Sequence, residues 1–280
     1  MTIFFNKAPA TPNFLSQRIL DHLNGNGAAS SAVTGADRSA IPPSVVLFLL
    51  SPTGDRETGL GIPSLVLTKR SSRVRQPGDL CCPGGGLSER LDAMMAPLLG
   101  LPGGTLHRWP LWNRWRSRHP RLASRLSVFM AAGLREGVEE MRLNPFDFHF
   151  LGVLPPSELV MFERLILPLV GWLPNQQRFR PNWEVERMVS IPLDHLLNPE
   201  NYACYRITVD PRRDGSQGMD MLDLPCFVHR HGGDEEILWG VTFRITMDFL
   251  GRVFAFSPPP LDRLPVIRRR LSRHYRTGDG

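Results

Sequence analysis

Four charged residues in the segment LREGVEEMRL, residues 134–143, have the types and the spacing for metal chemistry: Arg135, Glu136, Glu139 and Glu140. On a helix, spacings of three and four residues place the three glutamates on one face, where each like-charged pair costs a few tenths of a kcal/mol, roughly. A hard divalent cation bound among the carboxylates would remove this repulsion. The pattern is also compatible with a solvated acidic face, on which Arg135 offsets part of the charge.

A glycine-rich turn, PGGG at residues 83–86, precedes the acidic segment. Glycines let a backbone approach a ligand closely, and carboxylates behind such a turn suit metal-assisted attack of water on a pyrophosphate. Upstream of the turn, the polar loop at residues 70–79 contains Arg70 and Arg75, which predict a contact with a further phosphate.

Helices and strands in alternation must position these residues. Helical periodicity is found at residues 14–23, 126–143 and 241–250, and short apolar runs predict strands at 44–50, 64–69, 148–154, 165–173 and 183–191. Because helices stand at both ends of the strand set, we expect an α/β/α sandwich, a mixed central β-sheet flanked by helices.

Three regions are expected along the chain. Residues 1–43 contain the first helix and a Gly/Ala/Ser-rich stretch at 25–40 that indicates a flexible linker, and residues 44–257 are expected to form the main domain, which contains the acidic segment. Prolines at 258–260 end that domain, and residues 258–280 form a basic tail.

Residues 91–125 differ in composition from the flanking segments and are interpreted as an insertion. Trp109, Trp112 and Trp115 alternate there with arginines, a pattern that would suit nucleic-acid binding, although a helical flap whose tryptophans pack on the domain is favoured. A lid, a contact in a homodimer and a membrane-surface patch stay open as its role.

Composition bounds the class of protein. The 280 residues are 42% hydrophobic, which is ample for a packed core, and the net charge of +6 is carried almost entirely by arginines, because Lys7 and Lys69 are the only lysines. Guanidinium groups favour planar recognition of phosphate or carboxylate. The sequence contains no export signal and no apolar run long enough to span a membrane, so a reduced, cytoplasmic protein is expected.

The acidic segment resembles the second half of the Nudix hydrolase signature, G-x5-E-x7-R-E-U-x-E-E-x-G-U, in which U is a bulky apolar residue. The segment VLTKRSSRVRQPGDLCCPGGG, residues 66–86, is similar to the longer motif of the coenzyme A pyrophosphatase branch. Further resemblance lies in ILPLVGWLP, in PNWEVERMVSIPLDHLLNPENY, which contains Glu184, and in ILWGVTFRI.

This resemblance implies an enzyme that needs Mg²⁺ or Mn²⁺ and cleaves a pyrophosphate bond in a nucleoside-diphosphate derivative. Coenzyme A or an acyl-CoA is the implied small-molecule substrate, giving 3′,5′-ADP and a phosphopantetheine. A capped RNA end, another dinucleotide, or a catalytically weakened binding module are the alternatives. The implied metal ligands are Glu136, Glu139 and Glu140, with Arg135 as an orienting ion-pair partner. The implied substrate contacts are Arg70, Ser71, Arg75, Gly84, Gly85, Gly86 and Glu184.

The sequence departs from the signature inside its central part. Between Gly85 and Arg135 lie 49 residues where the motif has 13. The first glutamate of the motif has no clear counterpart, because Leu91 stands at its position, and Asp92 or Glu89 could replace it only in a rearranged loop. If the extra residues displace Gly85 from Glu136, the site is not assembled.

Overall fold

A computed structural model describes residues 12–41, 43–54, 61–159, 164–176, 178–209, 220–271 and 275. Its larger, eight-stranded sheet has the strand order β3-β2-β1-β7-β5, while β4 pairs with β1, β6 with β7 and β8 with β2. The strands are β1 (Ser44–Thr53), β2 (Ile62–Arg70), β3 (Leu80–Cys81), β4 (Gly84–Gly85), β5 (His149–Val153), β6 (Ser157–Leu159), β7 (Arg164–Trp172) and β8 (Val185–Pro192). Strand β1 runs parallel to β7 and antiparallel to β2, so the sheet is mixed as expected.

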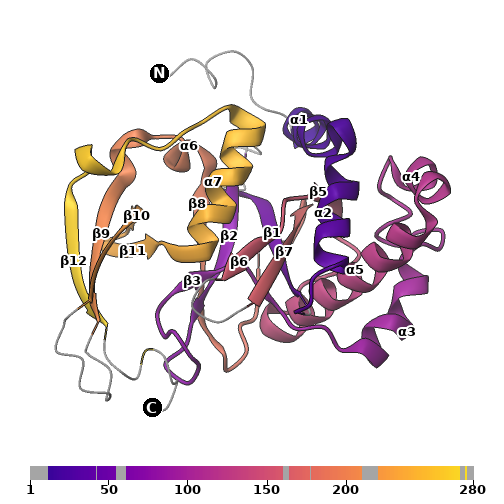
Figure 1. Cartoon of the computed structure of the whole chain (residues 1–280), viewed down its shortest axis with the longest axis horizontal. Helices are drawn as coiled ribbons and strands as arrows, with labels where there is room; N and C mark the ends of the chain where they lie inside the picture. The colour runs from indigo at the N-terminus through magenta and orange to yellow at the C-terminus, as the bar shows by residue number, and fades with distance from the viewer. Residues whose placement is uncertain are drawn as a thin grey trace.

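Helices cover both faces of this sheet, which confirms the α/β/α sandwich (Figure 1). Successive side chains of a strand point to opposite faces, and in β1 Leu47 and Leu49 pack with α2 and α5 while Phe48 and Leu50 pack with α1 and α7. The helices are α1 (Pro12–Asn24), α2 (Ala28–Asp37), α3 (Glu89–Leu99), α4 (Trp112–Arg118), α5 (Pro120–Met141), α6 (Leu193–Leu196) and α7 (Gly240–Phe254), and short 3-10 turns are Gly25–Gly27, Pro199–Asn201 and Leu261–Arg263.

The expected flexible linker is wrong for residues 25–37, which form a 3-10 turn and helix α2. Ala29, Ala32, Val33 and Ala36 recur at helical spacing and are buried, so this stretch contributes a helix with a thin apolar face to the sandwich.

A second sheet lies beside the sandwich, at the left in Figure 1. Its strand order is β11-β10-β9-β12, with β9 (Tyr202–Val209), β10 (Asp220–His231), β11 (Asp234–Leu238) and β12 (Val266–Leu271). Strands β10 and β11 form an antiparallel hairpin. Residues 266–271 of the expected basic tail belong to this sheet, because β12 pairs with β9 over six residue positions, in parallel.

The insertion packs on the sandwich, on the right in Figure 1. It contains α3 and α4, and α5 begins at Pro120, earlier than expected, with proline in its first turn where no intrahelical N–H is required. Trp109 and Trp112 are buried, which confirms a flap whose tryptophans pack on the domain. Within the described residues, no helix combines the length and the apolar character that crossing a bilayer requires.

Candidate active site

The glycine turn and the acidic helix are neighbours in space despite the residues between them. Gly84 N–H donates to Glu140 Oε2 over 3.2 Å, and β4 is held against β1, where Leu47 N–H also donates to the Pro83 carbonyl over 2.8 Å. The insertion therefore loops out and does not displace Gly85 from Glu136.

Two of the glycines in this turn are required by close approach. A Cβ on Gly84 would lie 2.2 Å from the Val45 carbonyl oxygen, and the φ of +149° at Gly84 disfavours other residues. A Cβ on Gly85 would lie 2.5 Å from the Glu136 carboxyl carbon. Gly86 has open space around it, and its carbonyl accepts a hydrogen bond from Arg135 over 2.9 Å. The close turn thus depends on Gly84 and Gly85 having no side chain.

Arg135 lies at the centre of an ion-pair network. Its Nε donates to Asp92 Oδ1 over 2.9 Å, one of its terminal nitrogens donates to Glu136 Oε1 over 2.8 Å, and the same nitrogen lies 3.6 Å from Glu139 Oε2. Hydrogen bonds to Asp92 raise the pKa of Arg135 above its ordinary value. Arg135 therefore faces the carboxylates and the turn as an orienting partner would.

Asp92, which the sequence offered only as a replacement for the motif's first glutamate, joins the site through its pair with Arg135. Its side chain is fully buried in the first turn of α3, and its Oδ2 accepts hydrogen bonds from Ser88 N–H over 2.6 Å and from Arg135 over 3.3 Å. A buried carboxylate requires such partners. Asp92 stands one residue after Leu91, the position of the motif's first glutamate, and its carboxylate is engaged by Arg135 and the Ser88 N–H.

Burial raises the pKa of two glutamates on α5. Desolvation, together with the charges of Glu136 and Glu184, raises the pKa of Glu140 to about 8 against the opposing hydrogen bond from Gly84. Desolvation also raises the pKa of Glu136, and the charges of Glu139 and Glu184 act in the same direction. Neighbouring carboxylates thus disfavour the ionised forms of Glu136 and Glu140 here, a condition that a bound cation would relieve.

The donor chemistry fits a hard cation, but the side chains are not arranged around one. Among the described residues, no group of three or more His, Cys, Asp or Glu side chains stands in a geometry that could hold a metal ion. Glu136 and Glu139 are paired with Arg135, and Glu140 accepts from Gly84. Metal binding would therefore require side-chain rotations that exchange these partners for the ion.

The basic loop and the segment with Glu184 are joined beside the helix. Ser71 N–H donates to the Glu184 carbonyl and Ser71 Oγ donates to the Trp183 carbonyl, both over 2.8 Å. The charge of Arg70 lowers the pKa of Glu140, so Arg70 and Glu184 both act on the acidic site. Arg75 is exposed and receives the Arg70 Nε–H on its carbonyl over 2.6 Å. The structure thus assembles Arg70, Ser71 and Glu184 with α5 and leaves the Arg75 side chain in solvent.

Asp79 ties this loop to the end of the chain, a contact without a sequence signal. Its carboxylate accepts hydrogen bonds from Trp239 Nε1 over 3.1 Å and from the Tyr275 hydroxyl. Desolvation raises the pKa of Asp79 to about 6, although both hydrogen bonds oppose the shift. Tyr275 and Trp239 therefore hold the basic loop in place through Asp79.

Comparison with known proteins tests the resemblance. No family model matches the chain. It is 28% identical over 120 residues to the peroxisomal coenzyme A diphosphatase NUDT7 of Mus musculus, covering 42% of this chain and 47% of that protein. It is 24% identical over 185 residues to a protein described as the uncharacterized Nudix hydrolase NudL of Pectobacterium atrosepticum, covering 65% of this chain and 71% of that protein. The chain thus spans about half of the length of the mouse protein.

Among solved structures, the crystal structure of a MutT/nudix family protein from Enterococcus faecalis is 10% identical, with a TM-score of 0.38 over 88% of this chain and 75% of that one. The curated relatives agree in the family that their names give, and they confirm the resemblance found in the sequence.

Proposed function

We propose that this chain, a relative of the Nudix hydrolases, is a metal-dependent hydrolase that cleaves the pyrophosphate bond of a nucleoside-diphosphate derivative. The observation that carries the proposal is the contact of the glycine turn with Glu140, because it places a close-approach backbone against clustered carboxylates. Glu136, Glu139 and Glu140 would hold Mg²⁺ or Mn²⁺, whose oxygen-ligand preference they match. When bound, the ion supplies neutralisation of phosphate charge and a lowered pKa for a water.

The residues of the chain then have distinct tasks. One of the three glutamates takes the proton of the attacking water, whose oxygen bonds to phosphorus while the bridging P–O bond breaks. Arg135, fixed by Asp92, positions Glu136 and Glu139. The second phosphate can be met by Arg70, which already acts electrostatically on Glu140.

Coenzyme A or an acyl-CoA is the substrate that we propose, with 3′,5′-ADP and a phosphopantetheine as products. The support is the similarity of residues 66–86 to the motif of that branch and the printed name of the mouse relative, a coenzyme A diphosphatase. The test is a panel of coenzyme A, NADH, ADP-ribose and nucleoside triphosphates with Mg²⁺ or Mn²⁺. Fastest turnover of coenzyme A supports the proposal, and turnover of none of them contradicts it.

A binding module of the same fold is the second candidate, favoured by the ion pairs that occupy Glu136 and Glu139. The variant Glu136→Gln separates the two. It should abolish turnover in an enzyme, whereas a module would show no turnover with the native chain and unchanged ligand affinity with the variant.

A further inference from the structure

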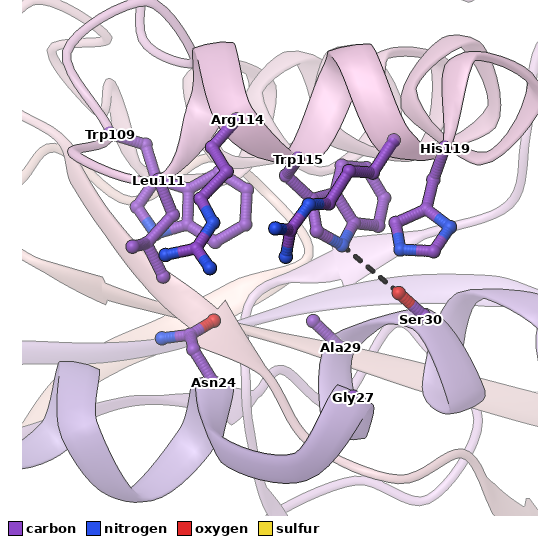
Figure 2. A pocket seen from close by; sticks show the side chains of 10 residues that line it. Asn24, Gly27, Ala29, Ser30, Trp109, Leu111, Arg114, Trp115 and His119 are labelled. Atoms are coloured by element: carbon purple, nitrogen blue, oxygen red, sulfur yellow. Dashed lines mark hydrogen bonds between the residues drawn. The ribbon is translucent and has the colours of Figure 1, made fainter.

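A cavity of about 340 Å³ lies between the N-terminal helices and the insertion, away from the acidic site (Figure 2). It is lined from one side by the chain around Asn24 and Ser30, and from the other by the segment between Trp109 and His119. His119 directly precedes α5, and Glu136 stands 17 residues further along. At 1.5 Å per residue, the two sites are roughly 25 Å apart. The cavity is thus a separate site.

The charge of the lining favours an anion. Arg114, Arg118 and His119 line the cavity and none of its described lining residues is acidic. Neither arginine forms an ion pair with any residue that the structure describes, whereas Arg125 of α5 pairs with Asp37 of α2. Figure 2 shows the Arg114 guanidinium directed into the gap above Asn24. Two guanidinium groups without protein partners are suited to a phosphate, which they can meet with paired N–H donors.

The remaining wall favours a flat ring. The rings of Trp109 and Trp115 lie edge to face, 5.8 Å between centroids, and Trp115 is fixed by a 3.1 Å hydrogen bond from its Nε1 to Ser30 Oγ. Leu111 adds apolar surface. The ring of Trp115 is only half-buried, so it provides a fixed stacking surface for a base at little entropic cost, with the buried ring of Trp109 behind it.

Two polar atoms of the lining have no partner. Asn24 donates from Nδ2 to the carbonyls of Leu20 and Leu151, over 2.7 and 2.8 Å, so its amide is fixed, but its Oδ1 is buried and accepts no hydrogen bond within the described residues. The Nε1 of Trp109 is likewise buried without an acceptor there. Buried polar atoms are rarely left unpaired, and these two are complementary to a ring that carries both a donor and an acceptor.

We propose that this cavity binds a nucleoside monophosphate, with the base against Trp115 and Asn24, and the phosphate on Arg114 and Arg118. A cavity of this volume is at the lower end of small-molecule sites, which suits a mononucleotide better than a dinucleotide. The inference does not rest on the proposed hydrolase activity, because it uses none of the residues of the acidic site.

The test is a titration of the full chain with AMP, without metal, followed by calorimetry and tryptophan fluorescence. AMP should bind, and adenosine or inorganic phosphate alone should bind at least about tenfold more weakly, because each makes only half of the contacts. No heat and no fluorescence change with AMP would overturn the inference, and so would phosphate binding as tightly as AMP.

Variants locate the site. Arg114→Gln and Arg118→Gln should each weaken AMP binding roughly tenfold, since each removes a charge-assisted contact. Arg116→Gln is the matched control, because Arg116 is exposed on the same helix and does not line the cavity. Glu136→Gln should leave AMP affinity unchanged. Loss of binding in Glu136→Gln, with full binding in Arg114→Gln, would place AMP at the acidic site and overturn the inference.

Discussion

At the scale of single residues, the site depends on the absence of a side chain at Gly85. In Gly85→Ala, the new Cβ would meet the Glu136 carboxyl carbon at 2.5 Å, so either the turn or the carboxylate must move. We expect kcat/KM to fall by more than about tenfold, as small misplacements in active sites do. Gly25→Ala is the control, since its Cβ would meet nothing within 4 Å. Equal activity of both variants, measured with Mg²⁺, would contradict the geometry.

Asp92 should contribute to stability more than an ordinary surface acid. Asp92→Asn removes the charge from a fully buried partner of Arg135, and we expect the free energy of unfolding to fall by about 2 kcal/mol. Asp248→Asn is the control, because its exposed pair with Arg252 should be worth less than about 1 kcal/mol. Urea denaturation measures both. An equal decrease in the free energy of unfolding in both variants would show that the buried pair stabilises the fold no more than the exposed pair does.

The raised pKa of Glu140 predicts a pH dependence of the metal-free protein. Its folded-state pKa of about 8 lies above the ordinary value of 4.5, so the folded chain binds more protons than the unfolded chain between these values. Stability should therefore fall as pH rises from about 5 to 8. Glu140→Gln should flatten this slope in thermal melts. A slope that is unchanged in the variant would assign it to other groups.

At the scale of elements, the apolar pattern of the sequence predicted those helices and strands that bury many large apolar side chains. It failed for elements that bury few of them. The sequence predicted β1, β2, β5 and β7 because apolar runs mark strands that are buried on both faces, and it also predicted β8, in which buried Val185, Val189 and Ile191 are separated by less buried residues. Helix α2 was missed because alanines form its buried face within a Gly/Ser-rich stretch. Strand β12 was missed because its side chains are mostly exposed arginines, and only its pairing with β9 makes it a strand.

That pairing predicts a consequence of truncation. A chain that ends at residue 257 loses β12 and Tyr275, leaving β9 with an unpaired edge and Asp79 without one of its donors. We expect a melting temperature several degrees lower and a tendency to aggregate, as exposed strand edges do. Differential scanning calorimetry and light scattering measure these. A truncated chain that is as stable as the full one would support a separate basic tail.

At the scale of the whole molecule, α5 joins the insertion to the acidic site. Its first turn lies beside the cavity of the proposed nucleotide site, and its last turns carry Glu136, Glu139 and Glu140. The C-terminal end of α5 lies against the glycine turn, because Gly84 donates to Glu140 and β4 pairs with β1. The insertion can thus lengthen the chain within the motif without separating the parts of the site.

The sequence was sufficient to predict which residues form the candidate site, but not most of the contacts between them. Spacing on a helix was sufficient to group the three glutamates, since 3.6 residues make a turn. The pairing of Asp92 with Arg135 and of Tyr275 with Asp79 joins residues far apart in sequence, and only the packed structure brings them together. Spacing alone could not have found these two contacts.

The most direct test of the hydrolase proposal is the rate at which the full chain releases 3′,5′-ADP from coenzyme A at saturating Mg²⁺, for the native chain, Glu140→Gln and Glu200→Gln. Glu200 is an exposed glutamate in the 3-10 turn Pro199–Asn201 and serves as the control. We predict full activity with Glu200→Gln and a loss of at least about a hundredfold with Glu140→Gln. Equal rates in all three proteins would contradict the proposal that the carboxylates of α5 carry the reaction.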